Sequence, residues 1–178
     1  MFSHSELDGY FCTLCKEFHS ELPISYGCHE PDSYLSLSSE DRSSRAVLAP
    51  SQCIVDNQKY FIRGLVEIPI LGLNEPFLWG VWASVWKEDF EEMDKHWHVQ
   101  GREKLIGPYK GRLNNSLSEY PDTLNLKCTI QVSVVGERPL FYIDEPDHPL
   151  AVEQKQGISL ERVQQIASKL CTKKDRVV

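Results

Sequence analysis

The middle of the chain carries apolar stretches that are typical of β-strands. Residues 60–70 are rich in β-branched and aromatic side chains, which predicts a long strand. Residues 77–86 are apolar on both faces, as in a strand that is covered on both sides of a sheet. Residues 124–134 alternate between apolar and polar positions, so one face is buried and the other is wet. Shorter strands are expected at 53–56, at 138–143 and, as an edge strand, at 109–113.

Helical patterns lie on either side of these strands. Residues 87–98 place three apolar side chains at spacings of three and four, which gives one apolar stripe. Ser38 and Ser159 each stand where an N-cap is expected, and we predict helices after both. Residues 145–150 contain two prolines and are interpreted as a loop.

The order of the elements favours an α+β fold, with a mainly antiparallel sheet, flanking helices and an irregular Cys-rich N-terminal segment. We expect one domain over residues 1–178. Residues 1–30 would form a Cys-rich N-terminal arm or zinc knuckle, and residues 31–172 the α+β core. Three tryptophans on the second long strand are expected in the core: Trp79, Trp82 and Trp86.

Composition and charge exclude several classes. The chain is 41% hydrophobic and 25% charged, as in an ordinary folded protein, and its net charge of -7 argues against a nucleic-acid partner. Its longest apolar run is about half of what a membrane helix needs. The first residues lack the basic start and apolar stretch of a secretory signal, so we expect a cytoplasmic protein. Its six cysteines should then be free thiols or metal ligands.

The N-terminal Cys12-x2-Cys15-x3-His19 motif is the local signal with the clearest chemistry. Zinc prefers four thiolate or imidazole ligands in a tetrahedron. The two cysteines supply two of them from one turn of chain, and His19 is near enough to be a third. The fourth ligand is expected to be Cys53, at the start of a strand, with Cys28 as the alternative. Unliganded thiols in a polar arm are the simpler interpretation. A redox dithiol is disfavoured because no buried strand precedes the motif.

A second group of polar residues suggests a different function. Arg63, Asp122, His148 and Glu153 are candidate catalytic residues of a small hydrolase-like enzyme. In that hypothesis His148 is a general base that Glu153 or Asp122 orients, and the four side chains converge in one cleft. The alternative for His148 is a turn residue that bonds to the backbone. No serine or cysteine stands in a recognisable nucleophile elbow.

Short motifs follow one another along the chain in a specific order: Cys12-x2-Cys15-x3-His19, Cys53-Ile54-Val55-Asp56, Phe61-x-Arg63-Gly64, Glu67-Ile68-Pro69, Glu75-Pro76-Phe77-x-Trp79-Gly80-x-Trp82, Tyr120-Pro121-Asp122-Thr123-Leu124-Asn125-Leu126 and Asp147-His148-Pro149-Leu150-Ala151-x-Glu153-Gln154. The set resembles the bacterial domain-of-unknown-function 2199 family across nearly the whole chain. This resemblance implies a soluble, single-domain protein without an established activity or known catalytic residues.

Three functions therefore follow as hypotheses. The leading one is a cytoplasmic binding or interaction module that carries a structural zinc and is compatible with a protein partner, without nucleic acid or membrane. The second is the hydrolase-like enzyme. The third is an acidic immunity-type protein, whose charge would steer a basic partner toward an exposed acidic or aromatic patch.

Overall fold

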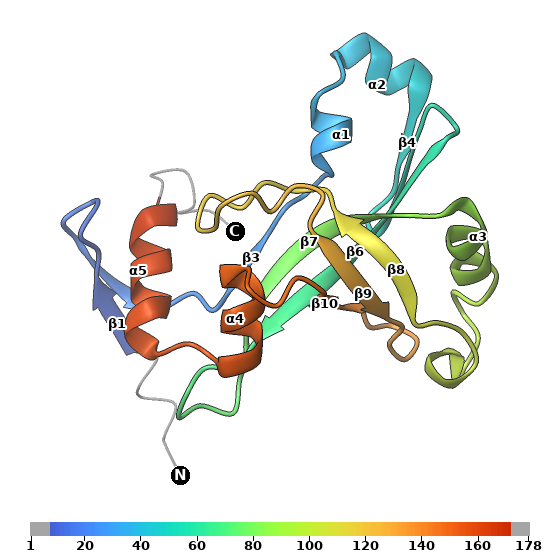
Figure 1. Cartoon of the computed structure of the whole chain (residues 1–178). Coiled ribbons are helices and arrows are strands. Elements are labelled where there is room, and N and C mark those ends of the chain that lie inside the picture. Colours follow the sequence, from blue (N-terminus) through green and yellow to red (C-terminus); the bar gives the residue numbers. More distant parts are fainter. Residues whose placement is uncertain (1–7, 172–178) are drawn as a thin grey trace.

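The computed structural model describes residues 8–171, and its centre is a closed five-stranded barrel (Figure 1). Neighbouring barrel strands follow one another along the chain, and consecutive strands are antiparallel. The fifth strand of such a meander must run in the same direction as the first, so the barrel closes through a parallel pairing, with Leu140 opposite Leu65. The barrel strands are β6 (Lys59–Ile68), β7 (Phe77–Val85), β8 (Tyr109–Leu113), β9 (Lys127–Gln131) and β10 (Leu140–Ile143).

The two long strands, β6 and β7, also belong to an extension outside the barrel. The first half of β6 pairs with β5 (Gln52–Val55), which in turn pairs with β4 (Ala46–Leu48), and the second half of β6 meets β10. In the same way β7 meets β8 near one end and pairs in parallel with β3 (Ser25–Gly27) nearer the other. The α+β class is confirmed. The sheet is mixed, however, because closing the barrel and adding β3 both require parallel pairs.

Helices lie in three places around the barrel (Figure 1). α1 (Asp32–Leu35) and α2 (Ser39–Arg45) lead from β3 into β4, and Ser38 caps α2 by accepting a hydrogen bond from the Asp41 N–H. α3 (Lys87–Lys95) and the short 3-10 helix η2 (Arg102–Lys104) follow β7 on one side. α4 (Pro149–Gln156) and α5 (Leu160–Leu170) follow β10 on the other. None of the described helices has the length and apolar character that a membrane crossing requires.

One large apolar cluster fills the barrel and continues under α4 and α5, with residues such as Phe77, Val81, Ile130, Phe141, Leu150, Val163 and Ile166. A second, small cluster lies elsewhere and contains Cys53, Val55, Phe61 and Trp82. The expectation that Trp79 and Trp82 are core residues is confirmed, since both are buried.

Three expectations from the sequence are wrong in detail. The strand at 109–113 is internal, because both β7 and β9 pair with it. Part of the proline-rich loop is the start of α4, where Pro149 occupies the first helical turn and His148 is the cap. Trp86 is not in the core and is 73% exposed, because β7 ends one residue before it and the chain turns into α3. The expected absence of a secretory signal concerns residues 1–7, which lie outside the described residues.

Gly64 marks the point on β6 where β10 approaches, and its substitution tests the barrel closure. A Cβ built at this residue would lie 2.7 Å from the carbonyl oxygen of Pro139 and would clash with the Phe141 ring. We expect Gly64→Ala to lower the free energy of unfolding by about 1–3 kcal/mol, measured by urea denaturation. In the control, Gly27→Ala, the nearest atom is the mobile end of Arg63 at 3.2 Å, so the loss should be smaller. Equal losses would contradict the close approach.

Candidate metal centre

A tight N-terminal hairpin positions three of the candidate ligands. β1 (Asp8–Phe11) pairs with β2 (Phe18–Glu21), and Tyr10 stands opposite His19. The turn between the strands is closed by two backbone hydrogen bonds, from Cys12 N–H to Glu17 and from Lys16 N–H to the Cys12 carbonyl. Lys16 has a positive φ of 60°, which reverses the chain directly after Cys15. The turn therefore holds both thiols beside the first residues of β2.

The fourth candidate ligand, Cys171, comes from the far end of the chain. Ser159 caps α5 by accepting a hydrogen bond from the Arg162 N–H, and the apolar stripe of α5 packs on the core. Cys171 follows the last residue of this helix and stands at its C-cap. The hairpin lies against α5 (Figure 1), and the Cys12 thiol is 3.9 Å from the carbonyl oxygen of Ser168. Packing of the apolar stripe thus places the end of α5, and with it Cys171, next to the hairpin.

The ligand atoms of Cys12, Cys15, His19 and Cys171 all lie within 4.8 Å of one another. His19 Nε2 is 3.1 Å from the Cys15 sulfur and 3.6 Å from the Cys171 sulfur. Tyr10 stacks on the His19 ring, with the ring centroids 5.0 Å apart, and this contact orients the imidazole. Within residues 8–171 this is the one group of three or more such side chains close enough to share a metal ion.

The electrostatics of the cluster favour one thiolate. Burial alone would raise the pKa of Cys12, but hydrogen bonds from the backbone N–H groups of Cys15 and Leu14 and from the neighbouring thiols outweigh burial and lower that pKa to about 6. Burial, followed by hydrogen bonds to Cys12 and Cys15, raises the pKa of Cys171 to about 12. A bound divalent cation would supply the positive charge that lets the other thiols ionise as well.

These donors fit a tetrahedral zinc or a similar soft ion. Zinc–sulfur and zinc–nitrogen bonds of about 2.3 and 2.0 Å place neighbouring ligand atoms roughly 3.5 Å apart. The distances of 3.1 and 3.6 Å from His19 bracket that spacing. The six cysteines are all free thiols, so no disulfide competes for these sulfurs.

The structure brings Cys12, Cys15 and His19 together, as the motif indicates, and adds Cys171 instead of the expected fourth ligand. Cys53 is fully buried in the small cluster with Trp82, where burial raises the pKa of its thiol to about 11. Cys28 packs partly against the same cluster.

Cys171 stands at a core-like position at the end of the last helix, where a cysteine is more often a small packing residue than a ligand. The sequence around Cys171 therefore carries no signal of a metal ligand. A thiol at the end of a core-facing stripe lies at the edge of the core, which is where the hairpin packs. Whether a cysteine at this position can bind a metal or only packs is decided by the contact between α5 and the hairpin.

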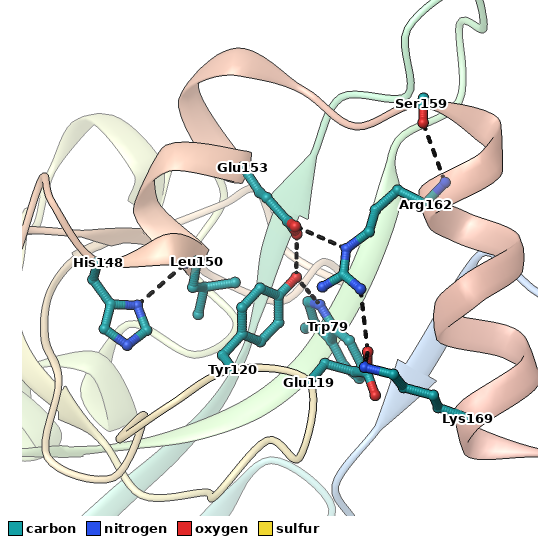
Figure 2. A network of polar contacts seen from close by, with 9 residues as sticks. All are labelled: Trp79, Glu119, Tyr120, His148, Leu150, Glu153, Ser159, Arg162 and Lys169. Carbon is teal, nitrogen blue, oxygen red and sulfur yellow. Dashed lines mark hydrogen bonds and ion pairs between the residues drawn. The ribbon is translucent and has the colours of Figure 1, made fainter.

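A polar network holds α5 in place (Figure 2). The Tyr120 hydroxyl donates to Glu153 at 2.6 Å and accepts from the Trp79 indole at 3.3 Å. Glu153 in turn pairs with Arg162 of α5 at 2.8 Å. Glu119, whose side chain is almost fully buried, accepts from Arg162 at 3.2 Å and from Lys169 at 3.3 Å. The network links β7, α4 and the loop before β9 to α5, and so to Cys171.

The candidate catalytic residues have other roles. His148 Nε2 is 2.6 Å from the carbonyl oxygen of Pro121, and its Nδ1 accepts from the Leu150 N–H at 3.2 Å. A carbonyl only accepts and an N–H only donates, so both ring nitrogens are engaged and no lone pair is left for a general base. His148 is thus the N-cap of α4, which matches the turn-residue alternative.

Arg63 does not lie with His148 and Glu153. The guanidinium of Arg63 lies 6.0 Å from the ring centroid of Trp82, beside the small cluster, whereas Glu153 is engaged with Tyr120 and Arg162. Asp122 is exposed in a strained turn, with φ of 44°. A cavity of about 970 Å³ between β6, β10 and α4 is lined by none of the four.

Comparison with known proteins adds a family and no activity. The sequence model of a family described as "Uncharacterized protein conserved in bacteria (DUF2199)" matches residues 11–158. No curated protein matches, and no solved structure does. The matched segment includes the hairpin motif and ends before α5, so Cys171 lies beyond it.

Removing the Tyr120 hydroxyl tests the network that positions α5. Burial, and then the Glu153 carboxylate, raises the pKa of Tyr120, so the hydroxyl is protonated and donates. We expect Tyr120→Phe to lower the free energy of unfolding by about 1–3 kcal/mol, because Glu153 and the Trp79 indole each lose a partner. Tyr142→Phe is the matched control, since Tyr142 is about half exposed. Indistinguishable urea midpoints for the two variants would contradict the role of the network.

Proposed function

We propose that this chain, which belongs to the DUF2199 family of uncharacterised proteins conserved in bacteria, is a binding module that does no chemistry and whose N-terminal hairpin is held against its C-terminal helix by one zinc ion. The observation that carries the proposal is the convergence of three thiols and one imidazole from opposite ends of the described chain. The expected ligands are Cys12, Cys15, His19 and Cys171.

The donor set supports a structural rather than a catalytic metal. Four protein ligands complete a tetrahedron, so no coordination position is left for water or substrate. Three sulfurs and one imidazole also favour zinc over magnesium or calcium, which prefer oxygen. A metal shared by Cys12 and Cys171 closes a loop of nearly the whole domain, and its binding energy then contributes to folding.

The hairpin supports an interaction role because it presents apolar side chains to solvent. Phe11 and Phe18 stand opposite each other in the ladder of β1 and β2, and they are 59% and 69% exposed. Leu14, in the turn, is 61% exposed. Exposed apolar groups gathered on one element are typical of surfaces that meet another protein. The partner expected here is a protein with an apolar surface, and the metal would hold the hairpin rigid for it.

Metal content tests the ligand set. Purified protein should carry about one zinc ion per chain, and Cys171→Ala should lose most of it. Cys53→Ala is the matched control, because Cys53 is a buried thiol outside the cluster and this variant should keep its zinc. Elemental analysis together with a thiol count gives the readout. Zinc lost from Cys53→Ala and retained in Cys171→Ala would exclude the proposed ligands.

Proteolysis tests whether the metal holds the hairpin. Lys16 is exposed at the turn, so trypsin should cleave after it once a chelator removes the metal. We expect chelation to speed this cleavage by about tenfold or more, since opening of the hairpin would no longer cost the metal–ligand bonds. The site is read by mass spectrometry of the fragments. An unchanged rate in protein shown to be metal-free would mean that packing alone holds the hairpin.

A further inference from the structure

The side of the barrel away from the candidate metal centre, where β7 leads into α3, carries a different feature (Figure 1). A cleft of about 430 Å³ opens there between the ends of β7, β8 and β9. Its volume is within the range of small-molecule sites in proteins. The hairpin and α5 lie on the other side of the barrel in Figure 1, so this cleft is separate from the candidate metal centre.

The cleft is basic although the chain is acidic. Three cationic side chains and one carboxylate line it, in a protein with a net charge of -7. The carboxylate, Asp144, is engaged with one of the cations, since Lys110 Nζ lies 3.0 Å from it and 2.6 Å from the Thr129 hydroxyl. The other two cations, Arg112 and Lys127, are left to determine the local charge.

Arg112 and Lys127 stand directly opposite each other in the ladder of β8 and β9. Like charges in such a pair repel and destabilise the sheet. Among the residues that the structure describes, the Arg112 guanidinium donates to a neutral acceptor only, the carbonyl oxygen of Asn125 at 3.3 Å. Glu145 accepts from the backbone N–H of Lys127, and within residues 8–171 neither cation forms an ion pair. An anion bound between them would relieve this repulsion.

Trp86 supplies an aromatic wall beside these charges. It lines the same cleft and is 73% exposed, which is unusual for the largest apolar side chain. Its position is fixed by the end of β7 and the start of α3. An exposed indole next to two cations offers a stacking surface for a flat ring that carries a negative charge.

The cysteine at the base of the cleft does not point to covalent chemistry. Cys128 is fully buried, and burial, followed by the charge of Asp144, raises the pKa of its thiol to about 12. Such a thiol is a poor nucleophile, so it is a packing residue. The site is therefore suited to reversible binding.

From these observations we infer that the cleft binds a small organic anion with a planar aromatic body. Its carboxylate or phosphate group lies between Arg112 and Lys127, and its ring packs on Trp86. This site is independent of the proposed zinc, because no residue of the cleft belongs to the metal cluster.

The test is a titration of the full chain, as purified, with phenyl phosphate, followed by two-dimensional NMR. Inorganic phosphate and benzyl alcohol each carry half of the proposed ligand and serve as comparison probes. We expect phenyl phosphate to shift the Trp86 indole signal, assigned with Trp86→Phe, and the amides of residues 110–112 and 127–128. Its affinity should exceed that of either probe by about tenfold, since both halves contribute.

Three variants identify the contacts. Arg112→Gln and Lys127→Gln should each weaken phenyl phosphate about tenfold by removing a charge-assisted contact, and Trp86→Ala should weaken it through the ring. The control is Lys104→Gln, an exposed cation outside the cleft, which should bind as the parent does. Without ligand, Arg112→Gln should unfold at a slightly higher temperature than the parent, because the repulsion is gone. A merely structural arginine would give the opposite shift.

Several outcomes would overturn this assignment. One is equal binding of phenyl phosphate and benzyl alcohol, which would mean that charge contributes nothing. Another is the absence of saturable shifts up to about 10 mM, a concentration at which even weak millimolar binding would register. Shifts located at the hairpin instead of the cleft, or equal affinities for Arg112→Gln and Lys104→Gln, would also refute it.

Discussion

The ladder between β6 and β7 is the contact on which the other elements depend. Its pairs run without a break from Tyr60 opposite Val85 to Ile68 opposite Phe77. Each strand is long enough to pair with two different neighbours along its free edge. One half of each edge therefore enters the barrel, and the other carries β5 or β3. Gly64 allows β10 to close onto β6 because it has no side chain at the crossing.

The N-terminal hairpin and the C-terminal helix α5 lie outside the barrel, so other contacts must hold them together. Packing of the apolar stripe of α5 accounts for part of the join. The almost fully buried carboxylate of Glu119 and the half-buried carboxylate of Glu153 fix α5 through Arg162. The hairpin itself contributes only Tyr10 and Cys12 to the core, since Phe11 and Phe18 face solvent. Its sulfurs and imidazole meet Cys171 instead. A small element with so few buried side chains is suited to being held by a metal, because metal–ligand bonds add to the limited apolar packing.

The candidate metal centre and the basic cleft differ in the kind of chemical group that each gathers. One gathers soft donors around a partly buried point, and the other gathers cations around an exposed indole. Both concentrate charge of one sign. In one case it is the Cys12 thiolate, which hydrogen bonds stabilise, and in the other it is the pair Arg112 and Lys127, which forms no ion pair within residues 8–171. That shared feature is why each is interpreted as a site for a ligand of opposite charge. The hydrolase hypothesis lacks such a feature, because the hydrogen bonds of His148 and Glu153 are satisfied within the protein.

Local pattern was sufficient for much of this molecule. Residue periodicity predicted both long strands and the capped helices at Ser38 and Ser159, and ligand spacing predicted the grouping of Cys12, Cys15 and His19, because these features depend on neighbours in sequence. The parallel closure of the barrel, the exposure of Trp86 and the choice of Cys171 over Cys53 were decided only by tertiary structure. Each depends on which distant surfaces meet. An apolar stripe predicts that one side of an element is buried, but it does not identify the element that packs on that side. The sequence therefore determined the elements and the grouping of three candidate ligands, whereas the packing of α5 against the hairpin decided which cysteine joins them.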